Sequence, residues 1–196
     1  YDPLYLLSYA QLIAASERGR ANIEPPYGFN RIITPHNLDS KIIDLLNVKY
    51  VFSLTPLGDD KFELVFEEGQ TKTYKNKNYM PRVFFVGQTI DKNTKQEQID
   101  EMFVQDLSKT AITEMFESQE NFVLGKALIT KYSENEIIVE AENLGEGFLV
   151  LSDSYYPTWD VFIDGRKTNI YKTDYTFRGI LVPKGTHEIV FKNRLF

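Results

Sequence analysis

The side chains best suited to recognise a ligand lie around the single tryptophan of the chain. Trp159 follows Tyr155 and Tyr156, and Arg178 lies in a later apolar segment. Aromatic faces can cover the C–H surface of a sugar ring, and a guanidinium can bind a phosphate or carboxylate through two donors. These four residues are the candidate ligand-binding set. Because Tyr155 and Tyr156 are adjacent, an extended segment would direct them to opposite sides, and at most one shares a face with Trp159.

Trp159 and Arg178 also have structural interpretations, which the sequence favours. Trp159 could be a core residue of a β-sandwich, since buried aromatic side chains commonly anchor such cores. Arg178 could form an ion pair with an acidic residue on a neighbouring strand. The binding and the structural interpretations differ in the solvent exposure that they require of Trp159 and Arg178, and the sequence leaves both open.

Catalytic and metal sites are not indicated by any motif. The chain has no cysteine and two histidines, His36 and His187, and a lone histidine is a poor metal site. Asp164-Gly165 is typical of a hairpin turn, and Asp153-Ser154 of a turn or a cap. Nothing selects a catalytic pair among the 28 acidic residues. We therefore predict no catalytic residue, no metal and no cofactor.

Composition and charge exclude several classes of protein. The 196 residues are 42% hydrophobic and 26% charged, which is typical of a globular chain rather than a disordered one. The net charge is −6 and no cluster of lysine or arginine is present, so nucleic acid is not an expected partner. No apolar run approaches the roughly 20 residues of a membrane-spanning helix.

The first part of the chain predicts a mixed α/β unit over residues 1–120. The expected helices cover 3–17, a segment capped by Asn37, and 95–103. The expected strands cover 31–33, 48–54, a hairpin of 61–66 with 71–74, and 82–86, whose apolar run predicts burial on both faces. Residues 104–120 receive no assignment.

Residues 121–196 predict an all-β unit. Seven short apolar segments alternate with turn residues, and they cover 125–132, 136–142, 147–151, 159–163, 168–171, 177–182 and 188–192. Such spacing is typical of a sandwich of immunoglobulin or jelly-roll type. The predicted fold class is therefore α+β, with a mixed α/β unit followed by a β-sandwich and a boundary near residue 120.

Several segments, in order, resemble a known family. Residues 155–159 read Tyr-Tyr-Pro-Thr-Trp, and an Asp-Gly turn, a Phe-Arg-Gly strand at 177–179 and a Pro-Lys-Gly-Thr-His turn at 183–187 follow. Upstream, residues 45–51 read Leu-Leu-Asn-Val-Lys-Tyr-Val and 81–84 read Pro-Arg-Val-Phe, after Tyr-Asp-Pro-Leu at 1–4. This set resembles the C-terminal region of YfhO-type bacterial multi-pass membrane proteins, which are similar to lipid-phosphosugar-dependent glycosyltransferases. Asn47 stands where that family usually has glycine.

The resemblance implies a place and a role for the chain. It implies an extracytoplasmic domain at the cell membrane, whose partner is the membrane-embedded part of the same parent protein. The acidic catalytic residues of such transferases lie in loops near the first membrane helices, so none is carried over here. We expect an accessory domain that positions a glycan, a cell-wall polymer or a partner protein. The alternatives are a purely structural or oligomerisation domain and, third, a free-standing glycosidase or esterase.

Overall fold

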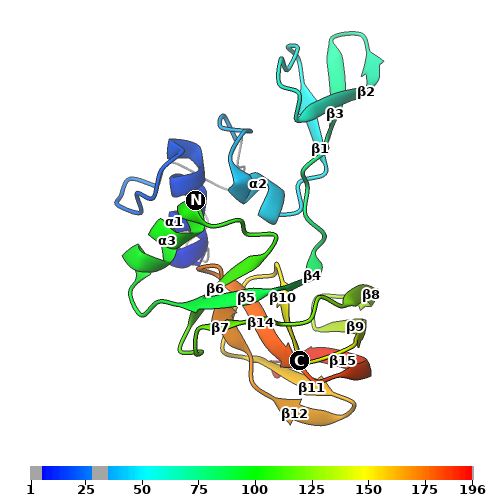
Figure 1. Ribbon diagram of the computed structural model, residues 1–196. Coiled ribbons are helices and arrows are strands. Elements are labelled where there is room, and N and C mark those ends of the chain that lie inside the picture. Colours follow the sequence, from blue (N-terminus) through cyan, green and yellow to red (C-terminus); the bar gives the residue numbers. More distant parts are fainter. Residues whose placement is uncertain (1–5, 28–34, 196) are drawn as a thin grey trace.

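The computed structural model describes residues 6–27 and 35–195, and most of these residues form three layers (Figure 1). Helices α1 (Leu7–Arg18), α2 (Lys41–Leu45) and α3 (Lys95–Val104) form the first layer. A seven-stranded sheet is the middle layer, and a five-stranded sheet packs on its other face. The chain thus has the predicted α+β fold with a β-sandwich.

The middle sheet joins strands from both sides of residue 120. Its order is β4 (Val83–Val86), β10 (Gly147–Leu151), β14 (Phe177–Val182), β13 (Tyr171–Thr173), β6 (Thr110–Glu114), β5 (Gln88–Asp91) and β7 (Gln119–Glu120). Its neighbouring strands are antiparallel except β5 and β6. The expected boundary near residue 120 therefore falls within one continuous sheet. Strands β5, β6 and β7 lie in segments that had no predicted strand.

The outer sheet consists of strands that follow residue 120. Its order is β12 (Arg166–Thr168), β11 (Trp159–Ile163), β15 (Gly185–Asn193), β9 (Glu136–Asn143) and β8 (Lys126–Tyr132). The single strand predicted over 168–171 was wrong. Thr168 pairs with Val161 in the outer sheet, whereas Tyr171 pairs with Gly179 in the middle sheet, because the chain crosses between the two sheets there.

Strand β4 illustrates how the middle sheet contacts both other layers. Val83 and Phe85 lie in the apolar core between the two sheets, and Phe84 and Val86 lie in the core beneath the helices. All four are buried, because alternate side chains of a strand point to opposite faces. The predicted burial of this strand on both faces is confirmed.

Helices α1 and α2 begin later than predicted. The first residues of the predicted helix 3–17 lie outside the described residues, as does the predicted strand 31–33. Helix α1 ends at Arg18, and the Gly19 that caps it has a left-handed φ of 63°. The Asn37 cap was wrong: Ser40 caps α2 by accepting from the Ile42 N–H.

Asn37 instead donates from its side-chain amide to the carbonyl of Ser16, at 2.8 Å. The same carbonyl, near the end of α1, also accepts from the Gly19 N–H at 3.1 Å. Asn47 follows α2 with a φ of 62°, a conformation that Asn accepts more readily than most residues. Asn47, which stands where the YfhO-type segment usually has glycine, therefore introduces little backbone strain.

A small third sheet projects from the layers (Figure 1). It has the order β1 (Tyr50–Ser53), β3 (Thr71–Asn76) and β2 (Phe62–Glu68), and it contains the predicted hairpin. The buried carboxylate of Asp44 in α2 ties this sheet to the helical layer. It accepts from Lys61 Nζ at 2.9 Å and from Asn76 Nδ2 at 2.7 Å.

The turn between β13 and β14 supports helix α1. Asp174 and Tyr175 have φ values of 46° and 73°, and both are buried. The Asp174 carboxylate accepts from the Ile112 N–H at 2.8 Å, and the Tyr175 hydroxyl donates to the Gln11 side chain of α1 at 2.7 Å. Helix α1 is therefore positioned by a turn whose left-handed backbone is unusual for residues other than glycine.

Candidate functional site

Three strands of the middle sheet bring polar residues together at one end. Val83 pairs with Leu151, and Leu151 pairs with Arg178. Arg82, just before β4, therefore lies close to residues 152–154, just after β10. The Ser152 N–H donates to the carbonyl of Arg82 at 2.9 Å. Residues 152–154, directly after β10, therefore lie beside the Arg82 side chain.

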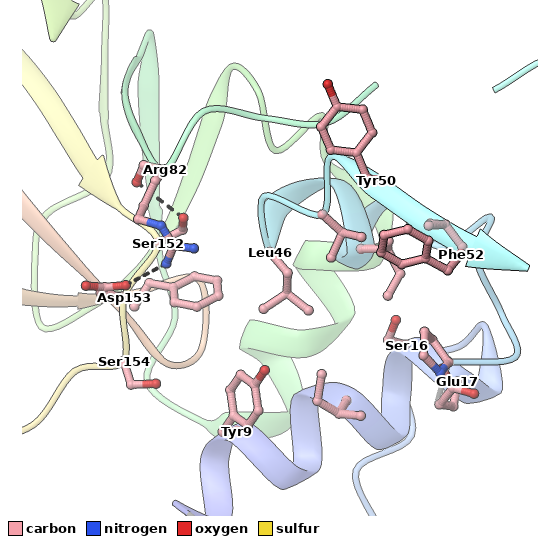
Figure 2. A pocket seen from close by; sticks show the side chains of 16 residues that line it. Tyr9, Ser16, Glu17, Leu46, Tyr50, Phe52, Arg82, Ser152, Asp153 and Ser154 are labelled. Atoms are coloured by element: carbon pink, nitrogen blue, oxygen red, sulfur yellow. Dashed lines mark hydrogen bonds and ion pairs between the residues drawn. The ribbon is translucent and has the colours of Figure 1, made fainter. Parts of the chain in front are cut away.

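Helix α1 and strand β1 complete a cleft above this sheet end (Figure 2). Tyr9, Ile13, Ser16 and Glu17 come from one face of α1, as their spacing of three and four residues requires. Strand β1 adds Tyr50, Val51 and Phe52, and the apolar floor includes Ile43, Leu46 and Phe177. We call this space, of about 650 Å³, the α1–β1 cleft.

The polar wall of the cleft contains an ion pair. Arg82 Nη1 lies 2.8 Å from Asp153 Oδ1, and the hydroxyl of Tyr132 donates to the same carboxylate at 3.0 Å. The Arg82 guanidinium also lies 5.6 Å from the centre of the Tyr132 ring. We call these three side chains the Arg82–Asp153–Tyr132 bridge. Burial, together with the charge and hydrogen bond of Asp153, raises the pKa of Tyr132.

The opposite end of the cleft is aromatic and exposed. In Figure 2, Phe52 lies near Ser16 and Glu17, far from Asp153. Phe52 is 74% exposed. Tyr9 lies between these two ends, and burial raises its pKa while Arg82 partly opposes the rise. The cleft thus combines exposed aromatic surface with hydroxyl, carboxylate and guanidinium groups.

The predicted residues Trp159 and Arg178 lie together. The Arg178 guanidinium stacks on the Trp159 ring at 3.9 Å, and its Nε and Nη2 donate to the carbonyl of Ser154 at 3.1 and 2.9 Å. Arg178 is only 4% exposed, and burial lowers its pKa to about 10. Through these two bonds Arg178 holds the loop that follows β10, whose Ser154 lines the cleft, in place.

Trp159 is half-buried and packs against the core of the sandwich. It also lines a smaller space of about 440 Å³ with Tyr132, Glu134 and Asp153, among others, which we call the Trp159 hollow. Tyr155 donates its N–H to Thr176, and Tyr156 is 45% exposed. Neither tyrosine is among the described residues that line the cleft or the hollow. Of the four predicted residues, the fold brings Trp159 and Arg178 together.

The sequence interpretation missed most residues of the α1–β1 cleft. Tyr9 and Glu17 come from helix α1, and Phe52 directly follows the motif at 45–51 without being part of it. The three side chains meet only through long-range packing. Arg82 and Asp153 were noted, Arg82 in a strand and Asp153 as a turn former. The register of β4 against β10 brings them together, and a single sequence does not reveal that register.

The described residues offer little for metal or acid–base chemistry. No group of three or more His, Asp or Glu side chains gathers in residues 6–27 and 35–195 in a way that could hold a metal ion. The carboxylates of Glu17 and Asp153 lie at opposite ends of the cleft in Figure 2, so they do not converge on one point. No helix in the described part of the chain is both long and apolar enough to cross a bilayer.

Comparison with models of protein families, with curated proteins and with solved structures gives no significant match. The resemblance to the YfhO-type family therefore stays a prediction.

Proposed function

We propose that this chain is an extracytoplasmic accessory domain of a membrane glycosyltransferase-like protein and that it binds a glycan in the α1–β1 cleft. The domain is not catalytic by itself. It holds or orients the glycan acceptor beside the membrane-embedded part of its parent, at the outer face of the cell membrane. The ordered motifs of the YfhO-type resemblance support the parent, and the net charge of −6 argues against a nucleic-acid ligand.

The observation that carries the glycan proposal is the make-up of the cleft. A sugar presents an apolar C–H face and a rim of hydroxyl groups that both donate and accept. Tyr9, Tyr50 and Phe52 supply aromatic surface for the first, and Arg82, Ser152 and Asp153 supply donors and acceptors for the second. A space of about 650 Å³ is within the range of small-ligand sites.

Calorimetric titration with a panel of soluble glycans and cell-wall fragments tests the proposal. We expect at least one neutral glycan to bind, and Phe52→Ala to weaken that binding by about tenfold, because the variant removes an aromatic face from the cleft. Phe66→Ala is the matched control. Phe66 is 58% exposed on the same small sheet but is not among the described residues that line the cleft.

Two results would count against glycan binding. The first is a panel in which no member binds the wild-type domain. The second is an equal loss of affinity in Phe52→Ala and Phe66→Ala, which would place the interaction on the small sheet rather than in the cleft.

A second candidate is a structural or oligomerisation domain. The small sheet favours it, since Phe52, Leu54 and Phe66 expose much of their apolar surface there. Exposed apolar surface of this kind often marks a protein interface. Sedimentation analysis of the wild type and Phe66→Glu separates the two: an oligomer that the variant dissociates supports this candidate, and a wild-type monomer at all concentrations refutes it.

A further inference from the structure

The α1–β1 cleft and the Trp159 hollow are neighbours. Asp153 lines both of them, and Arg82 lines the cleft while Tyr132 lines the hollow. The Arg82–Asp153–Tyr132 bridge therefore separates two spaces that open on either side of it. Tyr132 is 55% exposed and the Arg82 side chain is 36% exposed, so the bridge is accessible to a bound molecule.

We propose that the ligand is an extended oligosaccharide that occupies the cleft and the hollow together and lies across this bridge. The inference rests on the proposed function and adds the length of the ligand and its charge. Each space offers aromatic surface. Phe52 and Tyr50 supply it in the cleft, and in the hollow it comes from Tyr132 and from the part of Trp159 that Arg178 and the core leave uncovered. Repeated aromatic surface suits a polymer, because every sugar unit carries a comparable C–H face.

The charges that line the two spaces disfavour an anionic polymer. Asp153 neutralises Arg82 through the ion pair at 2.8 Å. Glu17 lines the cleft and Glu134 lines the hollow, so both ends carry a carboxylate. Carboxylates at both ends repel a polyanion. The ligand is therefore a neutral or amine-bearing oligosaccharide rather than one rich in phosphate or uronic acid.

Trp159 provides a direct readout of the hollow, because it is the only tryptophan of the chain. The probes are monomers, trimers and hexamers of glucose, galactose and N-acetylglucosamine, hexamers of glucosamine, and hexamers of galacturonic acid. Titrations follow Trp159 emission and heat in parallel. We expect affinity to rise about tenfold or more from monomer to hexamer, and Trp159 emission to change only with the longer chains.

Two tyrosine variants locate the ligand on the bridge. Tyr132→Ala should weaken hexamer binding much more than monomer binding, because only the hexamer reaches the Tyr132 ring in the hollow. Tyr156→Ala is the matched control: Tyr156 is exposed too but is not among the described lining residues, and this variant should bind every probe like the wild type.

The outcomes separate the inference from the function on which it rests. If a monomer binds as tightly as the hexamer and Trp159 emission does not change, the ligand does not extend into the hollow, although the cleft still binds a glycan. Galacturonate hexamers that bind as tightly as neutral ones overturn the assignment of charge. No binding of any saccharide refutes the proposed function, and the inference with it.

Discussion

The carboxyl group of Asp174 should make the stability of this fold depend on pH. It is fully buried in the turn beneath α1, where Oδ1 accepts from the Ile112 N–H and Oδ2 has no partner among the described residues. Burial raises its pKa from 3.8 to about 7. The group is not exposed, so solvent screening does not reduce the effect.

The direction of the pH dependence follows from the number of protons that the folded and the unfolded states bind. Between pH 3.8 and about pH 7 the unfolded chain has released this proton, whereas the folded chain still holds it. The free energy of unfolding therefore falls as the pH rises through this window. A shift of roughly three units corresponds to about 4 kcal/mol, of which about 2 kcal/mol is lost above pH 5.5.

Asp174→Asn isolates this contribution, because an amide resembles the protonated carboxyl and tolerates a left-handed φ. Urea unfolding should find the variant about 2 kcal/mol more stable than the wild type at pH 5.5, where the unfolded wild type has already released its proton, and about 4 kcal/mol more stable at pH 8.5. Asp60→Asn, at an exposed position, should leave the profile unchanged. Parallel profiles for Asp174→Asn and the wild type would refute the reasoning.

Three further variants test other parts of the fold. Gly179→Ala should destabilise by about 1–3 kcal/mol in urea unfolding, because its new Cβ would lie 2.5 Å from the Phe148 ring, whereas Gly58→Ala meets no atom within 4 Å and should not. Thr94→Ala should cost about 1 kcal/mol by removing the capping box of α3, and an unchanged midpoint would show that the cap contributes nothing. Arg178→Met removes both donors to Ser154, so it should cost about 1–3 kcal/mol and make Trp159 easier to quench, and unaltered quenching would contradict the supporting role of Arg178.

Local chemistry made much of the secondary structure predictable. The alternation of the buried Ile137 and Val139 with Ile138 and Glu140 on the other face, and the Asp164-Gly165 turn, depend on a few neighbouring residues and can be read from one sequence. Helix α3 was predicted from the helical pattern of residues 95–103, and the structure adds a capping box of Thr94 and Glu97 at its start. These signals do not depend on distant parts of the chain.

The pairing of the strands was harder to predict from the sequence. Pairing of β4 with β10 and of β6 with β13 joins segments on opposite sides of residue 120, and no local pattern encodes such pairs. The segment around Asn169 reads as one strand, but the chain changes sheets there. Tertiary packing overrides local propensity in such places.

The binding site was predictable only in part for the same reason. Trp159 and Arg178 stood out by residue type, and they do meet. Their roles depend on burial, which turned Arg178 into a support for Ser154 rather than a surface group. The α1–β1 cleft is formed by α1, β1 and the end of β10, which are far apart in the sequence, so no contiguous motif predicts it.

The most direct test of the central claim is to map the amide signals that move when a panel glycan is titrated into the ¹⁵N-labelled domain. We predict shifts centred on Glu17, Phe52 and residues 152–154, which line the α1–β1 cleft. Shifts confined to strand β2, or no shifts with any glycan of the panel, would contradict it.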